Sequence, residues 1–407
     1  MRRRLGSWRP ALPGALLSLL LFSIPLAAIA ESGMRRALDT LDGALDQLDR
    51  APNVVALSAC VSDGDELVFQ QLHGQRALES SEPVDERTRF RIASLSKGFA
   101  ATLAAMLERE DKLSLSEPVV DAVPWFALKD TGQRDAARLE HLLTHQIGLP
   151  PNAYDNLLEA NWDPANIVKR FPAIDMICPV GDCYGYQNVG YNLIADAITR
   201  RTGRPFQELV EERLFEPLDM SDSGFGAEHL MSDDNWARPH IGRGRWLRGT
   251  QVKDSYYRVP AAAGINASTR DLCRWLMAQT EAFPQVLDGD LLATLHRPRV
   301  RTARELYRGK WRRNRLNDAE YGLGWRIYDY AGQKVIFHAG SVQGYGATIA
   351  LLPDWGIGIA TMWNSESIRT WGLVPTFLDA YFGLRPMDWM KLSELDGDPP
   401  TATGAGK

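Results

Sequence analysis

The segment from residue 94 to residue 107 constrains the fold most, because it is a predicted helix without a polar face. It lies within "FRIASLSKGFAATLAAMLERED". A helix that is apolar on all sides is buried. The chain must therefore wrap other elements around this helix, and Ser94 and Lys97 at its start are carried towards the interior. The large side chains at helical spacing are Leu95, Phe99, Leu103, Met106 and Leu107, and the small ones opposite are Ala101, Ala104 and Ala105.

Strand-like segments stand on both sides of a helical middle, which predicts an α+β fold. We expect one domain over 31–392, an antiparallel sheet flanked by helices with an inserted, mostly helical subdomain. The sheet part covers about 31–93 and 256–392, and the helical part about 94–255. The expected strands are 54–61, 66–72, 88–92, 323–330, 334–340, 346–353 and 356–364, and the expected helices outside the middle are 35–49, 268–279 and 370–383.

Residues 1–30 resemble a signal peptide, with arginines, a short apolar run and an A-x-A site ending at Ala30. We expect cleavage there and export, to the periplasm. A retained membrane anchor is the alternative, although the run is short and Pro25 interrupts it. No later stretch predicts a membrane span. The small, polar, Pro- and Gly-rich residues 393–407 predict a disordered tail.

Charge argues against nucleic acid as a partner. Loss of residues 1–30 removes four arginines and no acid, which leaves 42 basic and 51 acidic residues. Segment 297–315 is a local exception with nine basic residues. It is interpreted either as a solvated loop or as a basic lip that contacts an anionic substrate or polymer.

The four cysteines show no metal-binding spacing, and no cofactor is predicted. Cys178 and Cys183 flank a turn-like "PVGD", so an exported chain is expected to join them in a disulfide. Cys60 and Cys273 have apolar neighbours and are expected to be buried free thiols.

Ser94 and Lys97 are one helical turn apart and share a face. Burial lowers the pKa of a lysine and makes it a usable base, while the helix start favours developing negative charge at the serine. The alternative is a serine that caps the helix, followed by a lysine that reaches solvent.

Two later segments bear on this choice. In "CYGYQNVGYNL" the Tyr186 phenol is able to shuttle protons, and Asn188 is able to bind a substrate amide. In "VIFHAGSVQGYGA" His338, Ala339 and Gly340 end a strand before Ser341, where a glycine allows close approach to a ligand.

In this order, the segments resemble the serine β-lactamase and penicillin-binding superfamily, in the branch of class C β-lactamases, D-alanyl-D-alanine carboxypeptidases and related esterases. The resemblance covers about 50–380 and includes "LEHLLTHQIGLP", "AAAGINASTRDLCRW" and "YGLGWRI". It implies that Ser94 is the acylated nucleophile. Lys97 and Tyr186 would move its proton, and Asn188 would bind the substrate amide.

By the same resemblance, the backbone N–H groups of Ser94 and Ser341 would form the oxyanion hole. The segment His338-Ala339-Gly340 stands where the third motif of the superfamily, K-T-G, is found, so His338 and Gly340 would contact the substrate. A histidine there is mostly neutral at pH 7, unlike the lysine usual in class C β-lactamases, so efficient β-lactam turnover is in doubt. His145 is expected to be structural.

Other interpretations stay open to different degrees. No G-x-S-x-G pentad supports an α/β-hydrolase. A non-catalytic binding homologue is disfavoured because all three motifs are intact. The expected partner is a small-molecule or peptide substrate, with peptidoglycan included. The first expectation for the function is a serine hydrolase that acts on β-lactam or D-alanyl peptide-type amide bonds. The alternatives are a D,D-carboxypeptidase or endopeptidase of peptidoglycan and then a carboxylesterase of the same family.

Overall fold

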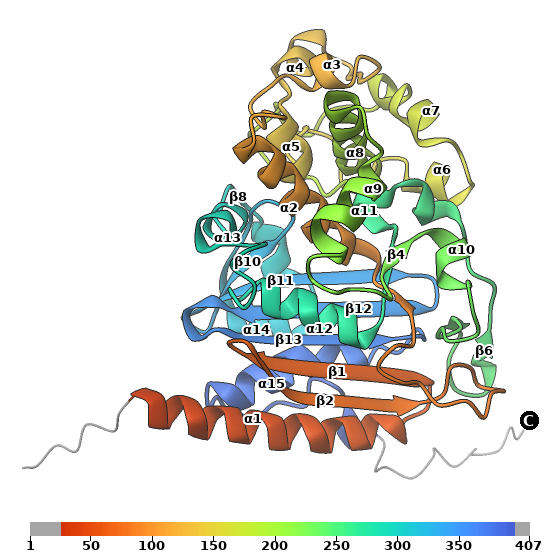
Figure 1. The fold of residues 1–407 in the computed structure, drawn as a ribbon, viewed down its shortest axis with the longest axis vertical. Coiled ribbons are helices and arrows are strands. Elements are labelled where there is room, and N and C mark those ends of the chain that lie inside the picture. Colours follow the sequence, from red (N-terminus) through yellow and green to blue (C-terminus); the bar gives the residue numbers. More distant parts are fainter. Residues whose placement is uncertain (1–25, 395–407) are drawn as a thin grey trace, which may run out of the picture.

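The computed structural model describes residues 26–394, and one large antiparallel sheet forms their centre (Figure 1). The strand order is β2-β1-β13-β12-β11-β10-β9-β8. The N-terminal hairpin pairs with β13 near the C-terminus, so segments far apart in sequence share one sheet and the middle of the chain is inserted between them. This confirms the predicted fold class. The strands are β1 (Ala56–Asp63), β2 (Glu66–Gly74), β8 (Val300–Arg301), β9 (Leu316–Tyr321), β10 (Arg326–Tyr330), β11 (Gln333–Val342), β12 (Tyr345–Leu352) and β13 (Ile357–Trp363).

Helices cover both faces of this sheet. On one face α1 (Leu26–Asp49) packs against α15 (Leu373–Tyr381), and on the other α12 (Thr269–Ala278) packs over β1 and β13. Strands β12 and β13 are buried along their whole length, as expected for strands covered on both sides. The Ser268 side chain caps α12 by accepting from the Asp271 N–H.

The remaining helices come mostly from the middle of the chain and gather beyond one side of the sheet (Figure 1). They are α2 (Ser96–Arg109), α3 (Val119–Ala122), α4 (Thr131–Ala136), α5 (Leu139–Leu143), α6 (Asp155–Glu159), α7 (Pro164–Val168), α8 (Val189–Thr202), α9 (Phe206–Val210), α10 (Gly226–Leu230), α11 (Pro260–Ala263), α13 (Gly289–Leu295) and α14 (Lys310–Arg315). Short 3₁₀ turns include η1 (Ala93–Leu95), η5 (Ser255–Arg258) and η6 (Ala303–Tyr307).

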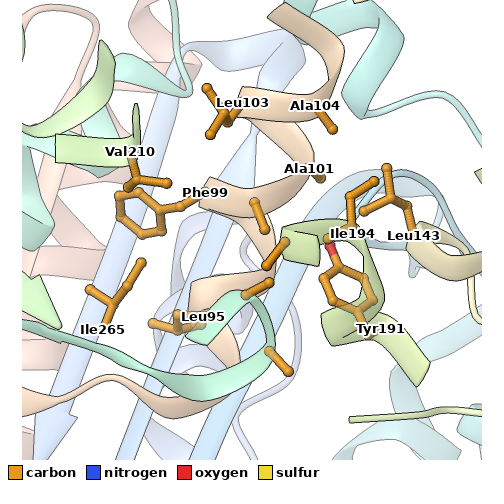
Figure 2. Packing of buried hydrophobic residues seen from close by; sticks show 14 of the residues in the cluster. Leu95, Phe99, Ala101, Leu103, Ala104, Leu143, Tyr191, Ile194, Val210 and Ile265 are labelled. Atoms are coloured by element: carbon orange, nitrogen blue, oxygen red, sulfur yellow. The ribbon is translucent and has the colours of Figure 1, made fainter. Parts of the chain in front are cut away.

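Helix α2 is the buried helix that the sequence predicts. Figure 2 shows Phe99 beside Val210 on one side of α2, while Ala101 faces Ile194 of α8 on the other. Phe99 and Ala101 are fully buried. The small side chains let α8 lie close, and this packing fixes where α2 begins, and with it Ser94 and Lys97.

The sequence prediction was incomplete in two regions. The strand expected at 88–92 is only β3 (Phe90–Arg91), because the chain turns into η1 at once, and it pairs with β7 (Ile265–Ala267) in a small separate sheet with β4 (Gly224–Phe225). The short strands β5 (His240–Ile241) and β6 (Arg248–Gly249) form another pair. Strands β8 and β9 and helices α13 and α14 were not predicted. Helix α13 is only seven residues long, and charged residues interrupt the apolar pattern in β8, β9 and α14.

Two disulfide bonds cross-link the chain. Cys178 and Cys183 are joined as predicted. The expectation that Cys60 and Cys273 are free thiols is wrong, because they form a second disulfide. Cys60 lies on β1 and Cys273 on α12, which packs over that strand. Their apolar neighbours correctly indicated burial, but a contact across 213 residues leaves no local signal.

The expectations for the termini fall largely outside the described residues. The predicted signal peptide lies mostly within 1–25 and the predicted tail mostly within 395–407. Helix α1 continues through the predicted cleavage position after Ala30. Among residues 26–394, no helix is long and apolar enough to cross a membrane.

Candidate active site

Ser94 lies in η1, directly before α2, on the wall of a cavity of about 1090 Å³. The preceding residue, Ala93, has φ +48°, a left-handed conformation that is uncommon for a residue with a side chain and is typical of strained functional turns. The interpretation of Ser94 as a helix cap is not supported, because Leu95 is the N-cap of α2 and no side-chain cap bond is present there.

Lys97 is fully buried on the first turn of α2. Its Nζ donates to Asn188 Oδ1 at 2.8 Å and to the Ala262 carbonyl oxygen at 3.0 Å, and lies 3.5 Å from Ser94 Oγ. Burial holds the pKa of Lys97 well below the ordinary lysine value, Asp155 opposes this shift, and Arg326 adds to it.

Tyr186 comes from the loop before α8, with its ring centroid 4.7 Å from Lys97 Nζ. Burial raises the pKa of Tyr186 to about 12, although a hydrogen bond with Ser94 opposes the rise. The phenol therefore stays protonated at neutral pH. Backbone hydrogen bonds hold this loop: the Asn152 N–H donates to the Tyr186 carbonyl oxygen at 2.7 Å.

Asn188 bridges Lys97 and Asp155 at one end of the site. Its Oδ1 accepts from Lys97, and its Nδ2 donates to Asp155 Oδ2 at 2.7 Å. Asp155 Oδ1 is buried and has no hydrogen-bond partner among the described residues. Asp155 therefore contributes a negative charge that Lys97 experiences through one intervening amide.

Strand β11 brings Gly340 and Ser341 to the cavity. A Cβ on Gly340 would overlap the Ile92 carbonyl oxygen and stand 3.0 Å from the Ser94 nitrogen, so only glycine allows the strand to lie this close to η1. The sequence-predicted residues that line one cavity are thus Ser94, Tyr186, Asn188, Gly340 and Ser341. Lys97 is buried directly behind them, in contact with Ser94 and Asn188.

His338 is placed differently. It is 2% exposed and does not line the cavity. Its Nδ1 bonds to the Ala339 carbonyl oxygen at 3.0 Å and its Nε2 to the Tyr321 hydroxyl at 3.1 Å. Burial, with Arg326 and Lys97 nearby, holds the pKa of His338 well below its usual range. A direct contact of this imidazole with substrate stays a prediction that the geometry does not favour.

A buried hydrogen-bond chain links His338 to the Tyr186 loop. The Gln187 N–H donates to His145 Nδ1 at 3.1 Å, so a neutral His145 carries its proton on Nε2, 3.3 Å from the Tyr321 hydroxyl. Tyr321 then donates to His338 Nε2, and the His338 Nδ1–H donates to Ala339. Two neutral imidazoles satisfy every bond, which makes the chain a brace between the loop and β11.

Arg326 provides the cavity with a cation that the sequence prediction missed. It opens β10, directly after Trp325, and its side chain is 9% exposed. Its guanidinium carbon lies 5.6 Å from the Tyr186 ring centroid, and Nη1 lies 3.0 Å from Glu305 Oε1. Gly324 permits this placement: with φ +75°, it approaches the Lys97 carbonyl, where a Cβ would stand 2.6 Å away.

Segment 297–315 contributes to the same cavity. Arg304, Arg308 and Arg312 line it, together with Glu305. Burial favours a raised pKa for Glu305, but Arg326, Arg312 and Arg308 together lower it, so its carboxylate stays ionised. The charged Arg326 within an apolar strand was a usable sequence signal, whereas Asp155 in "AYDNLLE" had none.

The site contains no arrangement for a metal within residues 26–394, where no group of three or more His, Cys, Asp or Glu side chains is placed to hold one.

Comparison with known proteins identifies the family. The β-lactamase family model matches residues 41–370, so the chain belongs to this family, whose members are generally serine hydrolases. Unguisins hydrolase ungD of Aspergillus violaceofuscus is 25% identical over 359 residues, which cover 80% of this chain and 61% of that protein. Penicillin-binding protein 4* of Bacillus subtilis is 23% identical over 324 residues, 75% of this chain and 67% of that protein. The chain thus spans about three fifths to two thirds of these relatives.

A solved structure supports the fold. The octameric penicillin-binding protein homologue from Pyrococcus abyssi superposes with a TM-score of 0.73 at 23% identity, covering 88% of this chain and 78% of that chain. The likeness confirms the predicted β-lactamase and penicillin-binding type of fold.

Proposed function

We propose that the chain is an exported serine hydrolase that forms an acyl-enzyme on Ser94 and acts on β-lactam or D-alanyl peptide-type amide bonds. The observation that carries the proposal is the surroundings of Lys97 Nζ. Two carbonyl oxygens, from Asn188 and Ala262, accept its hydrogens, and Ser94 Oγ is its third neighbour. A neutral amine has two N–H groups for those oxygens, and its lone pair then faces the Ser94 hydroxyl.

The reaction uses these groups in two steps. Ser94 Oγ bonds to the substrate carbonyl carbon while its proton passes to Lys97, and the protonated Tyr186 gives a proton to the leaving atom as the old bond breaks. Lys97 then returns a proton to Tyr186. In the second step water repeats the sequence and releases the acyl group. The Ser94 and Ser341 N–H groups would stabilise the oxyanion.

The depressed pKa of Lys97 supports its role as the base, because more of the side chain is neutral at physiological pH than in an ordinary lysine. A D,D-carboxypeptidase or endopeptidase is the second candidate. The open cavity of about 1090 Å³ lies at the upper end of the usual range for ligand sites and leaves room for a peptide.

A substrate panel tests the proposal. Nitrocefin, a D-Ala-D-Ala peptide and p-nitrophenyl esters should be compared with wild type and with Ser94→Ala. We expect turnover of at least one substrate, lost in Ser94→Ala while the folded protein persists. Equal turnover by Ser94→Ala would reject the mechanism. Binding of peptide without turnover of any substrate would support a non-catalytic homologue.

A further inference from the structure

The cavity at Ser94 has charged side chains of opposite sign at its two ends. At one end four arginines, Arg304, Arg308, Arg312 and Arg326, line the cavity together with the single carboxylate of Glu305. Glu305 pairs with Arg308 and Arg312 at 3.1 and 3.5 Å, and with Arg326. One carboxylate cannot neutralise four guanidinium groups, so this end keeps a positive surplus.

The other end is acidic. Asp155 and Glu159 of α6 line it, next to Tyr256, whose hydroxyl donates to Glu159 Oε1 at 3.2 Å. The basic lining residues all belong to the segment around α14 and to β10.

Contacts across the site order these charges relative to the reacting groups. Asp155 bonds to Asn188, and Asn188 bonds to Lys97. Lys97 and Arg326 both lie against the Tyr186 ring, with Nζ of Lys97 at 4.7 Å and the guanidinium carbon of Arg326 at 5.6 Å from its centroid, whereas no contact joins Arg326 to Asn188 or Asp155 among the described residues. The acidic end is therefore on the Asn188 side of Ser94, and the basic end is on the Tyr186 side.

We infer that the site takes a substrate that carries a cationic group in its acyl half and an anionic group in its leaving-group half, such as a zwitterionic peptide or aminoacyl ester. The inference rests on the proposed acyl transfer at Ser94. The leaving atom receives its proton from Tyr186, so the leaving half lies at the arginines. The acyl half stays bonded to Ser94 Oγ and extends towards Asn188, Asp155 and Glu159.

In this arrangement the basic segment 297–315 binds the anionic half of the substrate. Arg304 has no ion-pair partner within residues 26–394 and is exposed at the cavity, so a substrate anion is its available partner. Charge-assisted contacts to a carboxylate are roughly twice as strong as neutral ones, and exposed pairs contribute about 0.2–1 kcal/mol. Each exposed side chain should therefore alter selectivity by about threefold.

Four esters test the inference: alanyl-lactate, its N-acetyl form, its lactamide form, and the form with both changes, in the D and L series. Hydrolysis breaks the bond between the alanyl carbon and the lactate oxygen, which leaves as lactate with a proton from Tyr186. We expect the zwitterion to have the highest kcat/KM, about tenfold above each singly modified ester.

Variants assign each preference to one end. Arg304→Gln should lower the carboxylate preference about threefold and leave the amine preference unchanged. Glu159→Gln should do the reverse. Arg313→Gln is the matched control, since Arg313 belongs to the same basic segment 297–315, is exposed on α14, and does not line the cavity. It should change neither ratio.

Failure of the inference is distinguishable from failure of the proposed function. Equal rates for all four esters, or ratios that no variant moves, would overturn the inference. So would labelling of Ser94 by a fluorescent fluorophosphonate without turnover of any ester in either series. Absence of both labelling and turnover would overturn the proposed acyl transfer itself.

Discussion

The pH at which the proposed hydrolase becomes active should move in opposite directions when Asp155 and Arg326 are neutralised. Lys97 acts as a base only when deprotonated, so kcat/KM rises with pH through its pKa. Asp155 raises that pKa and Arg326 lowers it, against the larger lowering by burial. Asp155→Asn should therefore shift the rise to lower pH, and Arg326→Gln to higher pH.

The structure sets the size of these shifts. Hydrogen bonds of 2.7 and 2.8 Å through the Asn188 amide separate the Asp155 and Lys97 charges by roughly 7 Å. At an effective dielectric constant of about 20, their attraction is about 2.4 kcal/mol, or roughly 1.7 pH units. Lys97 Nζ lies 4.7 Å and the Arg326 guanidinium carbon 5.6 Å from the Tyr186 ring centroid, which places the two charges at most about 10 Å apart, so a shift of roughly one unit or more is expected.

The assay is hydrolysis of an uncharged p-nitrophenyl ester from pH 5 to pH 10, with Ser94→Ala as the blank. Asparagine at position 155 keeps an acceptor for Asn188, so the loop should stay in place. Glu159→Gln is the control, because it removes a charge from the same helix as Asp155 but Glu159 is not among the groups that shift the pKa of Lys97. The pH profile of this variant should stay within a few tenths of a pH unit of the wild-type profile. Shifts of the same sign in the Asp155 and Arg326 variants, or none, would refute the assignment of Lys97 as the base.

Two further predictions concern the frame of the site. Replacing Cys60 and Cys273 by alanine should lower the free energy of unfolding by roughly 4–5 kcal/mol, because their disulfide closes a loop of 213 residues; urea denaturation measures this, and free thiols in unreduced peptide maps would contradict the bond. His145→Ala should lower kcat more than it raises KM, because the hydrogen bonds that connect the Tyr186 loop to Tyr321 are lost. The free energy of unfolding should also fall by about 1–3 kcal/mol. An unchanged kcat would show that this hydrogen-bond chain does not position Tyr186 and serves stability alone.

The sequence predicted the parts of the site that carry a local pattern. Ser94 and Lys97 are one turn apart on an apolar helix, and their proximity follows from helical spacing alone. The strands after Tyr321 alternate or run apolar, so β10 to β13 were predicted to within a few residues. These features depend on neighbours in sequence, which is where physical rules for helices and strands apply most directly.

The parts that were missed depend on tertiary contacts. Asp155 reaches Lys97 only through Asn188, and Cys60 meets Cys273 only because α12 packs over β1. The sequence left segment 297–315 open between a solvated loop and a basic lip, because its charges are spaced without a pattern. Arg304 reaches the cavity through the fold of η6, which a single sequence does not reveal.

The central claim is a covalent acyl-enzyme on Ser94, and intact-protein mass spectrometry of an acid-quenched reaction tests it most directly. Wild type mixed with benzylpenicillin or a p-nitrophenyl ester should gain the mass of the acyl group, and peptide mapping should place it on Ser94. The Ser94→Ala protein should gain none. An adduct on another residue, or steady turnover in Ser94→Ala, would contradict the account.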